Sequence, residues 1–182
     1  MTLTDIANIV LEDIGAKAIG NIDGDDVNAR KIKRRMPLSI SEVCNLRNWA
    51  CLVKIVELSR IEDGRSLGGL YKFNVPRGLL KIIEPIMCTI EDDAILSPFE
   101  KLTIKATILD NNPDHWDVNL TGAILAQLKA DIAFMILGDA NLAAQIKQLA
   151  ARDIQRFIKN DIYRSRGKRP KPPPLASGYF VL

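Results

Sequence analysis

The sequence predicts a mixed α+β fold that is mainly α: a helical bundle with a long C-terminal helical hairpin and a small inserted antiparallel β-sheet. Apolar residues recur at steps of three and four near both ends of the chain, as on amphipathic helices. The middle of the chain is instead rich in Val, Ile and Leu and is broken by Gly and Pro, as in short strands. Aromatic residues make up only 5% of the 182 residues, so aliphatic and alanine packing, which favours helices, must fill the core.

Domain boundaries follow this change of pattern. We expect one discontinuous helical bundle over residues 1–50 and 110–166, with the inserted sheet over residues 51–109. Residues 167–182 are predicted to form an extended arm that is basic and rich in proline. The length suits one domain with a real core and a small appendage.

Two helices are expected at the N-terminal end. The first, over residues 2–16, has one apolar face, and Thr2 or Thr4 can cap its start. After a turn with the sequence NIDGDD, the second should run from about Asp25 to Trp49. Pro37 lies within its pattern and should kink it, because proline removes one helical hydrogen bond.

The segment that follows has the character of short strands separated by turns. Strands are expected at residues 51–59, 70–76, 81–91 and 101–109, with a short one possible at 92–97. The sequence EDGRSLGG, residues 62–69, is expected to be a mobile glycine-rich loop that can order against a partner. It lacks the Gly-Lys-Ser/Thr ending of a phosphate-binding loop, and no helix begins directly after it.

The last two helices form the hairpin. Residues 118–137 are apolar almost all round, which places that helix in the middle of a bundle or at a subunit interface. Gly138 should end it, and Asp139 or Asn141 should cap the next helix. That closing helix is amphipathic, with an apolar side from Leu142 to Ile162 that includes Leu149. The pair is expected to be antiparallel.

No targeting segment or membrane span is predicted. The N-terminus, MTLTDIANIV, has no basic region before an apolar run, so it does not read as a signal peptide. The longest apolar run is interrupted by Gln127, Lys129 and Asp131. By that interpretation no stretch reaches the roughly 18 residues of a membrane span.

Charge is unevenly distributed, although the formal net charge is only +3. Residues 1–29 carry six acidic residues against Lys17 alone, and RKIKRR, residues 30–35, then has five cations in six positions. The C-terminal end adds further cations, with no acid after Asp161. Such polarity suits docking onto charged neighbours or proximity to nucleic acid, and the alternative is that both runs are solvated faces.

No catalytic, cofactor or metal site is predicted. The three cysteines are scattered and lack metal-ligand spacing, so buried free thiols in a reducing cytoplasm are expected: Cys44, Cys51 and Cys88. His115 lies between two acids in DHWD and could act as a base, but it has no partnered nucleophile, so we expect a turn residue. Trp116 is expected to plug the end of the bundle. These observations favour a structural or binding role over an enzymatic one.

Several local features occur in a particular order. The opening helix reads IANIVLEDIGAKAI, and the turn IDGDD leads to a helix with Ala29 and Arg30 that ends in LRNWACLVK, with Trp49. An aromatic strand closing on proline follows, YKFNVPRGLLKI. Residues 102–154 then combine a strand, a DHWDV turn, an alanine-rich helix, a Gly-Asp turn and a closing helix. Over residues 3–163 this set resembles the head-to-tail adaptors of short-tailed bacteriophages, also called tail tubular protein A. Val118 departs from it, since that family often has proline there.

The resemblance implies a non-enzymatic structural virion protein without a cofactor, assembled in the host cytoplasm and not on a membrane. It implies a homo-oligomeric ring, a dodecamer, between the portal protein and the tail nozzle protein, with DNA passing through the lumen and contacted non-specifically. Acidic and basic runs on separate segments suit a ring in which one patch meets a different patch on the next subunit. By fold analogy the sheet would face the tail partner through its loop: Gly64, Arg65, Ser66, Leu67, Gly68 and Gly69.

The C-terminal arm is the most distinctive segment. The helix before it should end after Arg166, because Gly167 and Pro170 follow. PKPPP favours a polyproline spacer of about 3 Å per residue, and GYFVL offers an apolar tip that can enter a groove or add a strand to a sheet edge. The alternative is a disordered end. The resemblance assigns the arm to the portal, through these residues: Arg164, Arg166, Lys168, Arg169, Lys171, Tyr179, Phe180, Val181 and Leu182.

Two other functions stay open at this point. A basic helical nucleic-acid-binding protein would use RKIKRR and the C-terminal end, although no aromatic residues are interleaved with these cations and no nucleic-acid motif is recognised. An enzyme whose site is assembled from dispersed carboxylates has the least support.

Overall fold

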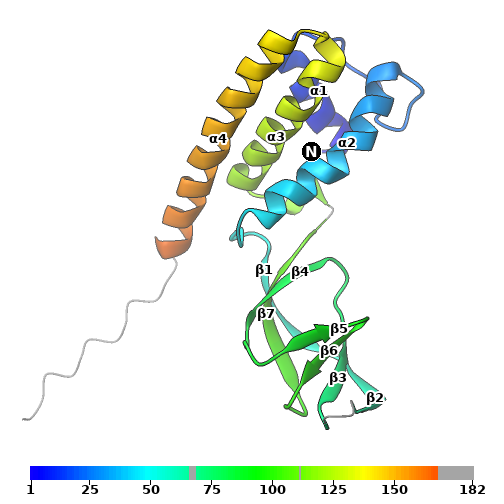
Figure 1. Ribbon diagram of the computed structural model, residues 1–182, viewed down its shortest axis with the longest axis vertical. Helices are drawn as coiled ribbons and strands as arrows, with labels where there is room; N and C mark the ends of the chain where they lie inside the picture. Colours follow the sequence, from blue (N-terminus) through cyan, green and yellow to red (C-terminus); the bar gives the residue numbers. More distant parts are fainter. Residues whose placement is uncertain (66–68, 111, 168–182) are drawn as a thin grey trace, which may run out of the picture.

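The computed structural model describes residues 1–65, 69–110 and 112–167, and it has the predicted mixed α+β fold. Figure 1 shows the helices gathered in a bundle at one end of the molecule and the strands at the other. The helices are α1 (Leu3–Asp13), α2 (Val27–Asn45), α3 (Val118–Leu137) and α4 (Ala140–Gly167), with a short 3-10 helix, η1 (Pro113–His115). The strands are β1 (Val53–Leu58), β2 (Arg60–Arg65), β3 (Tyr71–Asn74), β4 (Leu79–Glu84), β5 (Thr89–Glu91), β6 (Ala94–Ser97) and β7 (Leu102–Ile108).

Side-chain caps fix where the helices begin. Thr2, rather than Thr4, caps α1, since its Oγ1 accepts a hydrogen bond of 3.1 Å from the backbone of Asp5. Asp26 caps α2 by accepting from the Asn28 N–H at 2.7 Å, so α2 begins later than expected from the sequence. Asp139 accepts from the Leu142 N–H at 3.0 Å and so performs the expected capping of α4.

The C-terminal end of α2 lies four residues before the expected end at Trp49. Its last helical residue is Asn45, with Leu46 as the cap. The chain then folds back, and the buried indole of Trp49 donates a hydrogen bond of 2.8 Å to the carbonyl of Val43. That carbonyl belongs to the last turn of the helix and also accepts a hydrogen bond of 3.1 Å from the N–H of the cap residue Leu46. The tryptophan therefore terminates α2 instead of extending it.

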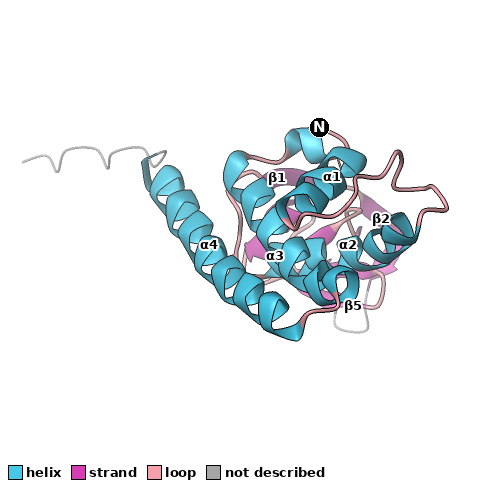
Figure 2. Cartoon of the chain, turned by 90° about the horizontal axis from the view of Figure 1, so that it is seen from above, coloured by secondary structure: helices cyan, strands magenta, loops and turns pink. Residues whose placement is uncertain are grey.

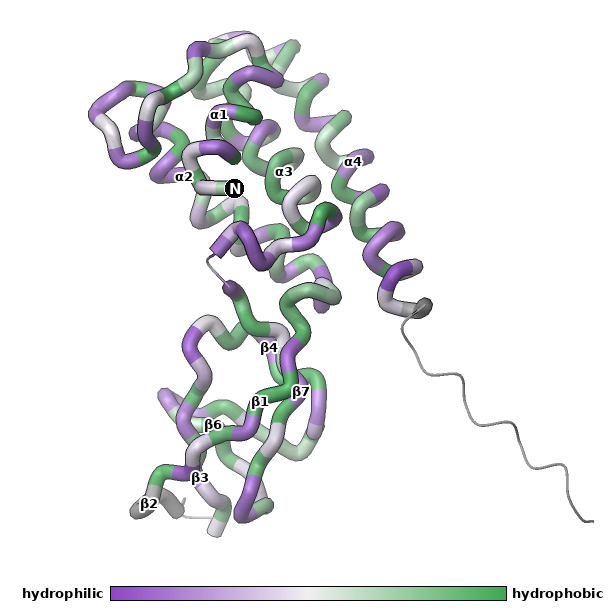
Figure 3. Tube along the Cα trace, turned by 180° about the vertical axis from the view of Figure 1, so that it is seen from behind, coloured by the Kyte–Doolittle hydropathy of each residue, from purple (hydrophilic) through white to green (hydrophobic). Residues whose placement is uncertain are grey.

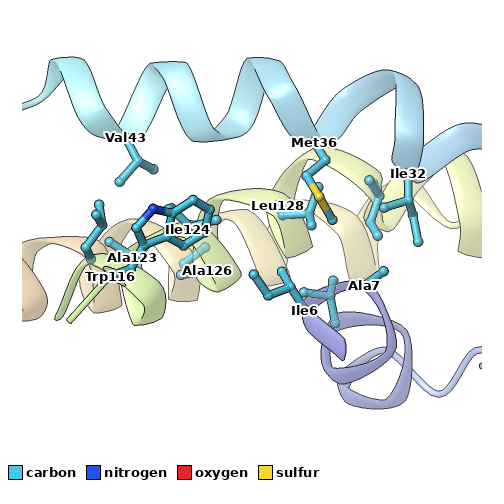
Figure 4. Close-up of a cluster of buried hydrophobic side chains, with 14 of the residues drawn as sticks. Ile6, Ala7, Ile32, Met36, Val43, Trp116, Ala123, Ile124, Ala126 and Leu128 are labelled. Carbon is cyan, nitrogen blue, oxygen red and sulfur yellow. The ribbon is translucent and has the colours of Figure 1, made fainter. Parts of the chain in front are cut away.

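Helix α3 is the centre of the bundle, as its apolar surface predicts. It packs against α4 along its length and against α2 and α1 on its other sides. Figure 4 shows Ile6 of α1, Met36 of α2 and Leu128 of α3 pointing into one shared core. Trp116, only 7% exposed, joins the same core as expected. Burial of such aliphatic side chains contributes about 1.5–3 kcal/mol each.

The expectation that no segment could cross a membrane is wrong on length and composition. One helix in the described part of the chain, α3, is long and apolar enough for a span despite Lys129 and Asp131. Lys129 Nζ pairs with Asp13 of α1 at 2.8 Å, and Asp131 accepts a hydrogen bond of 2.6 Å from the Ser39 hydroxyl of α2. The two charges thus face partners within the bundle, which is the environment of a core helix.

The inserted region holds two small antiparallel sheets rather than one. The first has the order β1-β7-β4, and the second has the order β2-β3-β6-β5. The expected strand at residues 81–91 is wrong, because the cis peptide Glu84–Pro85 separates β4 from β5 and carries the chain from one sheet to the other. Proline has no N–H for a sheet ladder. The glycine-rich loop is also shorter than expected, because β2 extends to Arg65.

Glycine at position 122 permits the closest approach of α3 and α4. A Cβ atom built at Gly122 would overlap the ring of Phe157 on α4. The ring therefore lies directly against the α3 backbone, in the contact that holds the hairpin together. The sequence pattern, which treats α3 as uniformly apolar, does not single out this glycine.

The substitution Gly122→Ala should destabilise the protein. Overpacking of this kind costs about 1–3 kcal/mol, which exceeds the gain of about 1 kcal/mol that alanine brings to a helix. Urea denaturation should show a lower midpoint for Gly122→Ala and recovery when Phe157→Leu is added. Gly20→Ala is the matched control, because a Cβ there meets no atom within 4 Å. An unchanged midpoint in Gly122→Ala would mean that the ring moves aside at no cost.

Candidate interaction surfaces

A buried ion pair anchors α4 to the segment between α2 and β1. Asp161 of α4 is fully buried, and its Oδ2 lies 2.9 Å from Nη2 of Arg47. Its Oδ1 accepts a hydrogen bond of 3.3 Å from the backbone N–H of Ala50. Nη1 of Arg47 also donates to the carbonyl of Ile158 at 3.0 Å. These contacts fix α4 beside the point where the chain leaves the bundle for the sheets.

Burial is the main influence on the pKa of Asp161 in this ion pair. Desolvation raises the pKa of Asp161, while the charge of Arg47 and the Ala50 N–H act in the opposite direction. The ion pair therefore offsets only part of the cost of burying the carboxylate. Sequence reasoning did not identify either residue, although Asp161 stands on the apolar side of the closing helix, where an acid needs a partner.

The DHWD turn is organised around Asp110. His115 Nδ1 lies 2.7 Å from Oδ2 of Asp110, Lys54 Nζ lies 3.2 Å from the same oxygen, and the Asn112 N–H donates to Oδ1. The His115 contact, followed by those of Asn112 and Lys54, lowers the pKa of Asp110 from 3.8 to about 2. Trp116 Nε1 donates to the Asp110 carbonyl at 2.6 Å. His115 thus belongs to a turn, as expected from the sequence, and it is mostly exposed.

The cysteines are free, and two of them are shielded. Burial raises the pKa of the Cys44 thiol to about 12, and it also raises the pKa of Cys51. Both thiols therefore stay protonated near neutral pH and are poor nucleophiles. Over residues 1–65, 69–110 and 112–167, no group of three or more His, Cys, Asp or Glu side chains could hold a metal ion.

The outer face of α4 is basic and lies at the edge of the bundle. Figure 2 shows α4 at one edge of the bundle, and Figure 3 shows polar and apolar residues alternating along it. Its exposed cations, with one tyrosine that is 71% exposed, are Lys147, Arg152, Arg156, Lys159, Arg164 and Tyr163. Two of these cations pair locally, Arg156 with Asp153 and Arg164 with Asp117. We call this set of residues the basic face.

Two leucines widen that face. Leu142 and Leu149, which were expected on the buried side of the closing helix, are 43% and 57% exposed. Because they are seven residues apart, both lie on the same side of α4, at the edge of the buried stripe that contains Ala150 and Ile154. α4 leaves them uncovered because it packs on α3 along a single narrow stripe.

Acidic turns lie on the other side of the molecule. The connection between α1 and α2, residues 14–26, is opposite α4 in Figures 1 and 2, and its exposed acids are Asp23, Asp25 and Asp26. β5 points away from α4 in Figure 1 and ends in the exposed acids Glu91, Asp92 and Asp93. We call these two groups the acidic turns. The exposed cations of α4 and these exposed acids therefore lie on different sides of the molecule, and the exposed Arg30 and Arg34 at the start of α2 follow the first acidic turn.

The RKIKRR run is largely used within the subunit. Lys31 Nζ donates to the Met135 carbonyl at the end of α3, at 2.6 Å, and Lys33 pairs with Asp23 at 2.8 Å. Arg35 contacts two acids, Glu42 and Asp131, at 3.0 and 3.1 Å. Arg30 and Arg34 remain exposed, and neither forms an ion pair with a residue that the structure describes. The run is therefore only partly a solvated face.

The residues predicted to contact partners fall into two separate regions. Arg164 and Arg166 belong to α4, and Arg164 Nη1 lies 3.3 Å from Oδ2 of Asp117, the cap of α3. Gly64 and Arg65 end β2, and Gly69 precedes β3 with a φ of 76°. Figure 1 shows β2 far from the bundle, so the two regions are not brought together. The rest lie outside the described residues: Ser66, Leu67, Gly68, Lys168, Arg169, Lys171, Tyr179, Phe180, Val181 and Leu182.

No protein-family model matches the chain, and no curated protein matches it in sequence.

Removal of Arg47 should be strongly destabilising. Arg47→Ala leaves the buried carboxylate of Asp161 without its counter-charge, which typically costs about 3–5 kcal/mol. Burial raises the pKa of Asp161, and protonation of this carboxylate at low pH relieves the cost. The loss of stability should therefore be smaller at about pH 5 than at about pH 8. Chemical denaturation at both pH values measures it.

Two variants control this experiment. Arg156→Ala removes an exposed pair with Asp153 and should cost less than about 1 kcal/mol. Replacing both partners, Arg47→Leu with Asp161→Leu, should recover most of the loss. A loss in Arg47→Ala no larger than that of Arg156→Ala would contradict the assigned role.

Asp110 should stabilise the fold only when it is ionised. Its pKa is lower in the folded protein, about 2, than its ordinary value of 3.8, so the contribution is present above the ordinary value and disappears as the pH falls towards 2. Asp110→Asn should lower the melting temperature at neutral pH, and the difference from the original protein should shrink across that acidic range. Asp25→Asn, an exposed acid, is the control, and a difference independent of pH would contradict this account.

Proposed function

We propose that this protein is a structural component of a virion, a head-to-tail connector that forms a ring between a portal protein and a tail nozzle protein, with DNA passing through the lumen. The observation that carries the proposal is the separation of charge between the basic face of α4 and the acidic turns on the other side. The ordered resemblance over residues 3–163 to head-to-tail adaptors supports it independently. The ring is a homo-oligomer, and its expected size, a dodecamer, comes from the resemblance alone.

Opposite charges on opposite sides favour a head-to-tail contact between copies. If the basic face of one copy meets the acidic turns of the next, each copy keeps one free surface of each kind. Repeating a contact of this type generates a closed ring when the rotation between copies closes. The α3–α4 hairpin, tightened at Gly122, then serves as the rigid wall.

Two segments of the subunit suit different partners. The arm that follows α4 starts beside the chain that leads into β1, and we assign it to the portal. We assign the segment between β2 and β3 to the nozzle. DNA in the lumen is contacted only through its backbone, because the exposed cations form no recognised base-reading motif. The protein acts without catalysis or a cofactor in this proposal, and its assembly takes place in the host cytoplasm before it becomes part of the virion.

A basic nucleic-acid-binding protein is the second candidate. Exposed Arg30 and Arg34, together with the basic face of α4, favour it. Against it, three cations of RKIKRR have partners inside the subunit. Fluorescence anisotropy of the isolated chain with duplex DNA separates the candidates, since a salt-sensitive affinity of the monomer would favour this one.

Charge reversal should stop ring growth at one face. We expect Arg152→Glu with Lys159→Glu to block the basic face, and Asp25→Lys with Glu91→Lys to block the acidic side. Each variant alone should fail to form rings, seen by electron microscopy with and without portal rings. An equimolar mixture should restore assembly, because the reversed faces of the two variants carry opposite charges and complement each other as the original faces do.

The control leaves both faces intact. Lys17→Glu with Glu57→Lys changes exposed charges outside the basic face and the acidic turns and should leave rings unaffected. Rings that appear only on portal still fit the connector. A chain that remains monomeric with and without portal would contradict it.

A further inference from the structure

An apolar hollow lies on the outer face of the β1-β7-β4 sheet. It has a volume of about 530 Å³ and is lined by Ile55, Pro85, Phe99 and the β7 residues beside them. Ile55 is 76% exposed and Phe99 is 46% exposed. Ile86 and Met87, which follow Pro85, are 91% and 67% exposed. A hollow with exposed apolar side chains in it and exposed Ile86 and Met87 next to Pro85 in the chain is a candidate interaction site.

The rim of the hollow carries positive charge. Ile55 is paired across the ladder with Lys105, which is in turn paired with Glu84 and lies 3.6 Å from its carboxylate. Lys101 also lines the hollow, is exposed, and forms no ion pair with the residues that the structure describes. An ammonium group beside an apolar floor suits the face of an aromatic ring.

The same site borders an open strand. β1 stands at the edge of its sheet, since it pairs only with β7 among the described strands. An extended segment laid beside β1 would gain main-chain hydrogen bonds from that edge and would place alternate side chains on the face of Ile55. The site therefore offers both a sheet edge and a pocket for an aromatic side chain.

One segment of this chain has the matching chemistry and begins nearby. The end of α4 is held against the residues that lead into β1, because Asp161 accepts from the Ala50 N–H. Beyond α4, residues 168–182 can span about 45 Å at about 3 Å per residue. Ile55 is two residues after the start of β1, so it is near the point at which α4 is held. Tyr179 and Phe180, in GYFVL, are the only aromatic residues outside the described ranges.

We propose that residues 176–182 of this chain dock on the outer face of the same subunit's β1-β7-β4 sheet, with an aromatic side chain in the hollow lined by Ile55, Pro85 and Phe99. The proline-rich stretch before them acts as the spacer. Docking within one subunit is favoured because the linkage gives the segment a high effective concentration at the site. A subunit in this state covers its own apolar surface and keeps its arm from other partners. The inference does not rest on the proposed function.

Photo-cross-linking in the full chain tests the docking. We would replace Phe180 by photoreactive p-benzoylphenylalanine, irradiate the purified protein and map the cross-linked peptides by mass spectrometry. We expect cross-links to peptides that contain Ile55 or residues 99–105. The yield per chain should stay constant on about tenfold dilution, because the contact is intramolecular.

Surface variants locate the site. Ile55→Asp should lower the yield about tenfold, as the loss of a central apolar contact does, and Lys101→Glu should lower it to a smaller extent. Ile90→Asp is the matched control, because Ile90 is 52% exposed but lies on β5 and does not line the hollow. It should leave the yield unchanged. Ile55 and Ile90 both face solvent, so neither change should unfold the protein.

Four outcomes would overturn the docking. The first two are cross-links elsewhere on the chain and a cross-linking yield that Ile55→Asp does not change. The third is a yield that falls on dilution, which would place the contact between copies. The fourth is cross-links that form only when portal is added. Electron microscopy of the same samples keeps the two proposals separate. If rings form but the internal cross-link does not, only the docking is contradicted. If the internal cross-link forms but no rings appear even with portal present, only the connector is contradicted.

Discussion

The contact between Asp161 and Arg47 ties α4 to the segment that leads from the bundle into the sheets. α4 packs chiefly on α3, along a stripe that leaves Leu142 and Leu149 uncovered. Such a stripe fixes the distance between two helices better than it fixes their register. The ion pair adds a single polar point at which α4 must meet the chain just before β1. The side that α4 turns outward and the place where the arm begins are constrained at that point.

This pair is better understood as a device for specificity than as a source of stability. Burial raises the pKa of Asp161 despite the cation beside it, so the carboxylate is held at a cost. Two apolar residues of similar volume would avoid that cost. They would also leave the orientation of α4 on α3 to packing alone, chiefly to the fit of Phe157 against Gly122. An uncompensated buried charge penalises every displacement of α4, which keeps its outer face in one orientation.

Local signals in the sequence predicted most of the bundle, and long-range pairing accounts for most of what they missed. Caps and helix ends such as Thr2, Asp139 and Gly138 are set by neighbouring residues, so they could be identified. The division into two sheets depends on which strands pair, and only Pro85 hinted at the break. Asp161 could have been found, because an acid in an apolar stripe requires a partner, but nothing local names Arg47. Most of the residues assigned to the arm and half of those assigned to the loop lie outside the described residues, so those assignments stay predictions.

The density of charge along the sequence does not show which charges are free to contact another molecule. RKIKRR is the densest basic run, yet Lys31, Lys33 and Arg35 are bound to groups of the same subunit. The cations of α4 are spread over many residues, so they attract no attention in the sequence, but the helix brings them onto one uncovered face. A contact with another molecule needs charges that are not already neutralised, because only these gain from a new partner. The dispersed set on α4 meets that condition better than the run does, and it lies on a helix whose outer side the bundle leaves open.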